Sequence, residues 1–281
     1  MKKINFIKMQ SLGNDFVIID KLKNTYKLNK KIIKNISDRF YGVGCDQVLV
    51  LEKSRKKEIS FNYKIYNKDG SESGQCGNGA KCVAKYYFDK YEKNKKEIIV
   101  ETIRNKMKLK KIGNQKIEVE IGIPNFNFSE KISKKDFFVH NGKKYKFESI
   151  FIGNPHAVFN MKDIEKINLA EFSENFSKKK FFKNGVNISI IQNIGKNNWK
   201  ARVFERGSGE TNSCGSAACA ITAATRKLKT NDLAYTSVHM KGGKAQVKWS
   251  GSDTDSIYLM GKSEYIFEGI YFIKWNIIYD K

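Results

Sequence analysis

The sequence has little proline, little histidine and no long apolar run, and each shortage removes a class of protein. No stretch approaches the roughly 20 apolar residues that a membrane-spanning helix needs. Residues 1–16 are too often interrupted by polar side chains for a signal peptide. The five cysteines lack the paired C-x2-C and the H-x3–5-H spacings of zinc sites, so we expect no metal and no disulfide framework. We therefore expect a cytoplasmic protein.

Arginine is also scarce, because only six of the 53 basic residues are arginine and the rest are lysine. Proteins that read nucleic acids favour arginine for its paired hydrogen bonds to guanine and phosphate. The lysines are scattered along the chain rather than gathered in one basic stripe, so the net charge of +24 indicates a solvated surface. We expect neither nucleic acid nor a membrane as partner. A nucleic-acid binder remains the alternative from another class.

Short runs of β-branched and aromatic residues are abundant, and they are typical of strands. They cover residues 4–9, 15–20, 48–52, 60–66, 96–103, 116–123, 146–153, 187–192, 199–205, 246–249 and 256–261. Two segments, residues 76–91 and 214–228, indicate helices. Each begins with a cysteine, a glycine and further small residues, as expected where a turn opens into a helix.

The two halves of the chain repeat one plan at an offset of about 140 residues, which is a signal at the level of the fold. Asn67 precedes Cys76 by nine residues, and Glu205 precedes Cys214 by nine residues. We predict an α/β (α+β) fold of two pseudo-symmetric lobes with a cleft between them. The expected lobes are residues 1–121, carrying Cys76, and residues 122–263, carrying Cys214, with residues 264–281 returning to the first lobe.

A cysteine at a helix start predicts acid–base chemistry. The exposed N–H groups and the positive end of the helix dipole stabilise a thiolate there and also bind a carboxylate. Two such cysteines suit the inversion of an amino acid at its α-carbon, because one removes the α-proton and the other returns a proton to the opposite face. Cys45, Cys82 and Cys219 are expected to be buried apolar residues instead.

Five ordered motifs resemble the diaminopimelate epimerase family. They are GNDF at 13–16, GVGCDQ at 42–47, NKDGSESGQCGNG at 67–79, GNPH at 153–156 and ERGSGETNSCGS at 205–216. The resemblance implies two lobes, each a β-barrel-like sheet around a central helix. It also implies a homodimeric isomerase without cofactor. Such an enzyme interconverts LL- and meso-diaminopimelate, the small-molecule substrates, in lysine and peptidoglycan precursor biosynthesis.

The same resemblance assigns roles to residues. Cys76 and Cys214 are the implied catalytic pair, and His156 and Glu205 are implied to tune their ionisation. Phe267 falls at the implied dimer contact, where the family has tyrosine, and Ala217 stands where the family usually has glycine. The implied substrate contacts are Asn14, Gln47, Asn67, Gly77, Asn78, Asn154, Asn187, Glu205, Arg206, Gly215 and Ser216.

Two further alternatives share the same residues. One is a relative of the same fold that acts on another substrate, such as proline or histidine. Arg206 and the set of amides favour a diamino diacid over proline. The other is redox sensing, in which Cys76 and Cys214 oxidise to a disulfide as a side effect of their activation.

Overall fold

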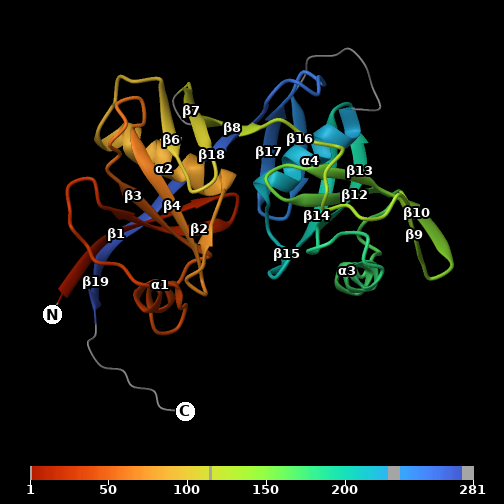
Figure 1. The fold of residues 1–281 in the computed structure, drawn as a ribbon, viewed down its shortest axis with the longest axis horizontal. Coiled ribbons are helices and arrows are strands. Elements are labelled where there is room, and N and C mark those ends of the chain that lie inside the picture. The colour runs from red at the N-terminus through yellow and green to blue at the C-terminus, as the bar shows by residue number, and fades with distance from the viewer. Residues whose placement is uncertain (1, 114–115, 227–234, 274–281) are drawn as a thin grey trace. The chain divides into compact units, whose positions relative to one another are not determined.

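The computed structural model describes residues 2–113, 116–226 and 235–273 (Figure 1). They fall into two compact units. The first unit takes the described residues of 1–117 and 262–281, and the second takes those of 118–261. None of the helices within the described residues is long and apolar enough to cross a membrane.

The first unit is built from strands and two helices. Its elements are β1 (Lys2–Ser11), β2 (Asn14–Asp20), α1 (Lys30–Ser37), β3 (Gln47–Glu52), β4 (Phe61–Asn67), β5 (Glu72–Ser73), α2 (Gly77–Lys90), β6 (Glu97–Glu101), β7 (Lys106–Ile112) and β19 (Glu264–Ile273), with β8 (Lys116–Gly122) running on into the second unit. Strand β1 pairs antiparallel with both β2 and β19. Strand β2 then pairs parallel with β3, and β3 pairs antiparallel with β4.

The second unit contains an additional β-hairpin, β9–β10, and its other elements follow the order of those in the first unit. Its elements are β9 (Phe137–His140), β10 (Lys143–Lys146), β11 (Glu148–Phe151), β12 (Pro155–Asn160), α3 (Leu169–Lys178), β13 (Asn187–Gly195), β14 (Asn198–Glu205), β15 (Gly209–Thr211), α4 (Gly215–Arg226), β16 (Thr236–Met240), β17 (Gly243–Lys248) and β18 (Ile257–Lys262). Strand β12 pairs parallel with β13, and β13 pairs antiparallel with β14.

The pairing pattern of the two units is the same. A helix connects the first parallel pair in each, α1 between β2 and β3 and α3 between β12 and β13. A second helix connects the next parallel pair, α2 between β4 and β6 and α4 between β14 and β16. The predicted α/β class is confirmed, and the internal repeat seen in the sequence is a repeat of strand pairing.

Helices α2 and α4 lie inside their units, and most residues of each helix are buried. Helix α2 packs against β1, β2, β3 and β7, and α4 packs against β11, β12, β13, β16 and β17. Alanines make up much of α4, and most residues of the helix are buried, as expected for a helix that is largely apolar all round. Cys82 on α2 and Cys219 on α4 are fully buried, as the sequence indicated, and so is Cys45.

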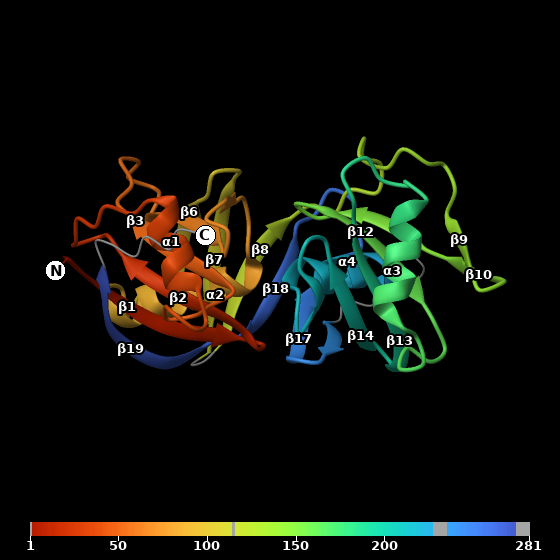
Figure 2. The same cartoon turned by 90° about the horizontal axis from the view of Figure 1, so that it is seen from below.

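Helices α1 and α3 cover the other face of the parallel strands, and the sequence pattern did not predict either of them (Figure 2). Alternate residues of a strand point to opposite faces. In the first unit Val17 and Val48 therefore pack with Ile33 of α1. In the second unit phenylalanines such as Phe172 and Phe176 of α3 form a cluster with the strands. Both parallel pairs are thus buried on two faces, which fixes their ends in space.

Candidate active site

Three of the implied substrate-binding amides lie at one edge of the first unit's sheet. Asn14 begins β2, Gln47 begins β3 and Asn67 ends β4. Because β2 and β3 are parallel and β3 and β4 are antiparallel, these three strand ends meet at the same edge. Gln47 and Asn67 are direct partners across the two strands, and Nε2 of Gln47 donates to Oδ1 of Asn67 over 3.0 Å.

Cys76 follows the end of β5 by three residues and caps α2. Its backbone is extended, with φ −149° and ψ 106°, and its sulfur accepts a hydrogen bond from the N–H of Gly79 over 3.3 Å. The half-buried Cys76 thus takes the place of the serine or aspartate that usually caps a helix. Gly77 and Asn78 are the first helical residues, where N–H groups lack partners within the helix. The predicted helix start at Cys76 is confirmed.

Close packing behind Cys76 depends on a glycine. A Cβ at position 79 would lie 2.4 Å from the hydroxyl oxygen of Tyr63 and 3.1 Å from a methyl group of Leu49. Tyr63 is fully buried, which raises the pKa of its hydroxyl well above the ordinary value. The same hydroxyl donates to the carbonyl of Cys76 over 3.4 Å. No motif singles out Tyr63, which lies in a strand pattern typical of any core.

The second unit places the corresponding residues at the corresponding strand ends. His156 lies at the start of β12, Asn187 begins β13 and Glu205 ends β14, with His156 directly beside Asn187 in the parallel register. The ring of His156 is fully buried and its Nε2 lies 2.8 Å from Oδ1 of Asn154. Burial lowers the pKa of His156 to about 3, so the ring is neutral at physiological pH.

Cys214 precedes α4 and is buried, unlike the half-exposed Cys76. Burial raises the pKa of the Cys214 thiol well above its ordinary value, and the hydrogen-bonded carboxylate of Glu205 raises it further. Ser216, whose Oγ lies 3.4 Å from the sulfur, and the N–H of Ala217 act in the opposite direction. The expectation of a thiolate stabilised by the helix start is wrong for Cys214 in this structure, because loss of hydration outweighs the helix N–H groups.

Arg206 is hydrogen-bonded to two other residues of the second unit, once through its backbone and once through its side chain. The N–H of Arg206 donates to Oδ1 of Asn187 over 2.9 Å, so the amide of Asn187 presents its nitrogen, a donor. Nη1 of Arg206 donates to the carbonyl of Asn184 over 2.6 Å. The side chain of Arg206 crosses Gly185, where a Cβ would lie 2.9 Å from Cδ of the arginine. Arg206 is exposed.

Ala217 and Phe267 are two positions at which this sequence departs from the family pattern. Ala217 is fully buried within the first turn of α4, which begins at Gly215. Phe267 lies on β19 and packs edge-on against Phe6 of β1, with ring centres 5.9 Å apart. The side chain of Phe267 is still 49% exposed.

Several contacts of the site could not be anticipated from the residues that the motifs supplied. Asp46 accepts from Nδ2 of Asn14 over 2.8 Å, and Ser71 accepts from Nδ2 of Asn67 over 3.1 Å. Both residues stand within the quoted motifs, Asp46 directly before Gln47 and Ser71 four residues after Asn67, and that position was the only available signal. Within the described ranges, no group of three or more His, Cys, Asp or Glu side chains is placed to hold a metal ion.

The chain is similar to known proteins both in sequence and in structure. A family model described as diaminopimelate epimerase matches residues 6–127 and 149–266. The chain is 34% identical over 280 residues to a diaminopimelate epimerase of Buchnera aphidicola subsp. Acyrthosiphon pisum (strain 5A), covering 97% of each protein. It is 37% identical over 275 residues to a diaminopimelate epimerase of Blochmanniella floridana, covering 95% of this chain and 99% of the relative. A phenazine biosynthesis protein of the PhzF family from Bacillus anthracis is similar in structure with a TM-score of 0.72, covering 97% of this chain and 100% of the other at 16% identity.

Proposed function

Because this chain belongs to the diaminopimelate epimerase family, we propose that it interconverts LL- and meso-2,6-diaminopimelate without a cofactor. The observation that carries the proposal is the duplicated half-site. In each unit a cysteine stands at the start of a buried helix, and polar side chains stand at the ends of the same pattern of paired strands. Such a duplication suits a reaction that needs two proton-transfer groups on opposite faces of one carbon.

Cys76 and Cys214 are the proposed proton-transfer groups. In one direction a thiolate removes the α-proton and the other thiol delivers a proton to the opposite face of the same carbon, and the reverse reaction exchanges these roles. The raised pKa of Cys214 supports its acting as the proton donor in the form described here. In the other direction the proton of Cys214 has to leave before the sulfur acts as a base, and the Glu205 carboxylate, which is hydrogen-bonded to the thiol, is the proposed group to take it.

The helix starts supply the electrostatic help that the reaction needs. The α-proton of an amino acid is very weakly acidic, so negative charge that develops on the carboxylate requires donors already in place. The N–H groups of Gly77, Asn78, Gly215 and Ser216 are the proposed donors. A single donor of this kind contributes about 3 kcal/mol to transition-state stabilisation in other enzymes.

The second amino-acid end of the substrate is the proposed partner of the remaining polar residues. The guanidinium of the exposed Arg206 and the side-chain nitrogen of Asn187 are donors that match a carboxylate. A substrate that lacks this end leaves such groups without partners, which is a strong basis for selectivity. Asn67 and Asn154 belong to the same proposed binding set, and His156 is proposed to act on ionisation through its contact with Asn154.

A homodimer in the cytoplasm is the proposed setting. Strand β19 carries partly exposed apolar side chains, among them Ile266, Phe267 and Ile270. An apolar strand face of this kind favours burial against a second copy, and Phe267 is the proposed contact. Size-exclusion chromatography with light scattering tests it, because a monomer at micromolar concentration would contradict the dimer.

Deuterium exchange tests the function itself. Purified protein is incubated with LL-diaminopimelate in D2O without added cofactor, and loss of the α-proton signal is followed by NMR. Cys76→Ala and Cys214→Ala are expected to slow the exchange by about a thousandfold or more, since each removes a reacting group. Cys219→Ala, at a buried cysteine of α4, is the matched control and retains the wild-type rate within a few-fold.

Two results would contradict the proposal. Wild-type protein that exchanges neither α-proton of diaminopimelate would remove the function, and full exchange by either cysteine variant would remove the two-thiol mechanism. A panel that includes proline and histidine separates the proposed substrate from those of other amino-acid racemases.

A further inference from the structure

The amide of Asn14 has its orientation fixed by a carboxylate. Nδ2 of Asn14 donates to Oδ2 of Asp46 over 2.8 Å. A carboxylate only accepts hydrogen bonds, whereas a primary amide has a donor end and an acceptor end. The nitrogen of Asn14 must therefore face Asp46, and Oδ1 faces away from it. Asp46 thus decides which end of Asn14 is presented at the sheet edge.

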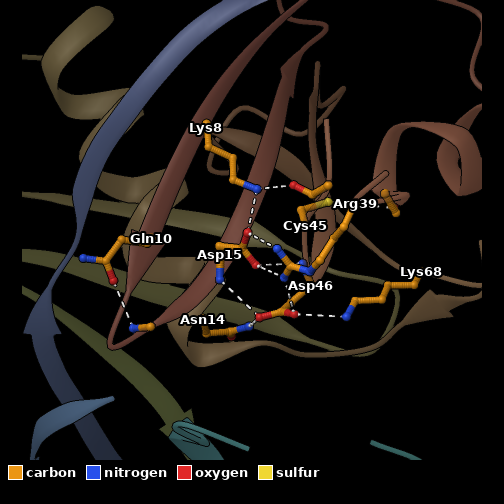
Figure 3. Close-up of polar contacts among 11 residues, drawn as sticks. Lys8, Gln10, Asn14, Asp15, Arg39, Cys45, Asp46 and Lys68 are labelled. Atoms are coloured by element: carbon orange, nitrogen blue, oxygen red, sulfur yellow. Dashed lines mark hydrogen bonds and ion pairs between the residues drawn. The ribbon is translucent and has the colours of Figure 1, made fainter. Parts of the chain in front are cut away.

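Asp46 is held in turn by Arg39, which follows α1, and by Lys68, which follows β4 and whose Nζ lies 3.2 Å from Oδ1 of Asp46 (Figure 3). The N–H of Asp15 also donates to Oδ2 of Asp46 over 3.3 Å. Arg39 donates to Oδ1 of Asp46 over 2.9 Å and to both carboxylate oxygens of Asp15 over 2.7 and 3.1 Å. The buried Lys8 donates to Asp15 over 2.6 Å and to the carbonyl of Gly44. Burial raises the pKa of Asp15, but hydrogen bonds from Arg39 and Lys8 outweigh burial and lower it to about 2. The carboxylate of Asp15 is therefore ionised at neutral pH and keeps Arg39 in place beside Asp46.

A second carboxylate acts through a hydroxyl group. Ser71 donates its one proton to Oδ1 of Asp69 over 2.6 Å, so its oxygen accepts from Nδ2 of Asn67 over 3.1 Å. This contact fixes the amide of Asn67, whose Oδ1 accepts from Nε2 of Gln47 over 3.0 Å. Gln47 consequently presents its oxygen, Oε1, as the free end. The orientation passes from Asp69 to Gln47 through two intervening side chains.

Two side-chain oxygens therefore stand at neighbouring strand starts, Oδ1 of Asn14 and Oε1 of Gln47. A pair of acceptors matches an ammonium group, whereas Asn187 in the second unit presents a donor. We infer that Asp46 and Asp69 are positioning residues that set these amides to bind an ammonium group of the substrate. The substrate named here, diaminopimelate, rests on the proposed function, while the orientations rest on hydrogen bonding alone.

Asp46→Asn tests the first carboxylate with almost no change in shape. Asparagine offers one oxygen where aspartate offers two, so Arg39 and Lys68 on one side compete for it with Asn14 and the N–H of Asp15 on the other. The charge-assisted bond to Arg39 is stronger, so the new amide turns its nitrogen toward Asn14, which then reverses and presents its own nitrogen. The expected result is a KM for diaminopimelate that rises about tenfold while kcat changes by about twofold or less, because the contact binds substrate and transition state alike. Asp163→Asn, which loses a similar ion pair with Lys166 at 3.1 Å, is the matched control and keeps the wild-type KM.

Ser71→Ala tests the second carboxylate and has a conservative rescue. Without the hydroxyl, Asn67 is no longer fixed, and KM is expected to rise about fivefold, the worth of one hydrogen bond. Ser71→Thr retains a hydroxyl and is expected to keep the wild-type KM. Ser250→Ala removes an equivalent bond to Asp255, also of 2.6 Å, and controls for the loss of a surface serine. Wild-type KM in both Asp46→Asn and Ser71→Ala, or no rescue by Ser71→Thr, would overturn the inference.

Neutron diffraction from crystals of deuterated protein tests the orientations without any substrate. The deuterons of Asn14 are expected to face Asp46, those of Asn67 to face Ser71, and the amide of Asn14 to be reversed in Asp46→Asn. An oxygen of Asn14 that faces Asp46 in the wild-type protein would refute the positioning role. A wild-type protein that does not epimerise diaminopimelate would refute the proposed function instead, and the diffraction result would then decide the positioning role by itself.

Discussion

Gly79→Ala is the sharpest test of the site, because the change is one methyl group in the first turn of α2. The added carbon would lie 2.4 Å from the hydroxyl oxygen of Tyr63. Carbon and oxygen need about 1 Å more than this to be in ordinary contact. The ring of Tyr63 is fully buried and its hydroxyl cannot swing aside. The start of α2, with Cys76 and its hydrogen bond to the N–H of residue 79, has to move instead.

The magnitudes separate activity from stability. Overpacking of this size costs about 1–3 kcal/mol, and alanine offsets about 1 kcal/mol of it through its higher helix propensity than glycine. The net loss in the free energy of unfolding is therefore expected to be about 1 kcal/mol, small enough for the variant to fold. A shift of about 1 Å in reacting groups costs about a hundredfold in turnover. Gly79→Ala is thus expected to lose far more activity than stability.

A second substitution checks the cause. Tyr63→Phe removes the hydroxyl that the new methyl group meets, together with its 3.4 Å contact to the carbonyl of Cys76. The double variant Gly79→Ala/Tyr63→Phe is expected to recover most of the deuterium-exchange rate with diaminopimelate, with urea unfolding measured in parallel. Wild-type exchange in Gly79→Ala, or a double variant no faster than the single one, would refute the reasoning.

Two further predictions concern buried ionisable groups. The folded pKa of His156, about 3, lies below the ordinary 6.5, so its stabilising effect is complete above pH 6.5 and is lost as pH falls toward 3. Between pH 8 and pH 5 the wild-type protein should lose about 2 kcal/mol more than His156→Gln in urea unfolding, and equal losses would contradict this. Asp20 accepts from Tyr86 over 2.7 Å, from the N–H of Leu22 over 2.8 Å and from Lys90 over 3.1 Å. Asp20→Asn should therefore lower the free energy of unfolding by about 2 kcal/mol, and an unchanged urea midpoint would show that these bonds add nothing.

Local pattern was enough for most of the strands and for the two central helices. Each of the predicted strand runs overlaps a strand, because β-branched and aromatic residues in alternation fit a buried pleated surface. The helices expected from residues 76 and 214 begin at Gly77 and Gly215, since small residues after a turn favour a helix start. The part of the second prediction that runs over residues 227–228 lies outside the described residues.

Helices α1 and α3 were missed for a reason that the structure makes plain. Ile33 and Ile36 belong to a β-branched run. Their helical spacing favours a helix only when the segment packs against β2 and β3. The available signal was the capping residue. Asn29 accepts from the N–H of Ile32 over 2.9 Å, and Asn168 accepts from the N–H of Glu171 over 3.3 Å, as asparagine does at many helix starts.

The sequence by itself determined which functional groups are present: two cysteines at helix starts, the equal spacing that precedes each of them, and a set of amides within the motifs. Only the tertiary structure decided the state of these groups. Cys214 has a raised pKa because other parts of the chain exclude water from it and bring Glu205 against it. Asn14 presents its oxygen because Asp46, held by Arg39, takes its nitrogen. The hydration of a side chain and its hydrogen-bond partners depend on the residues that surround it in the folded protein, and many of those residues are distant in sequence.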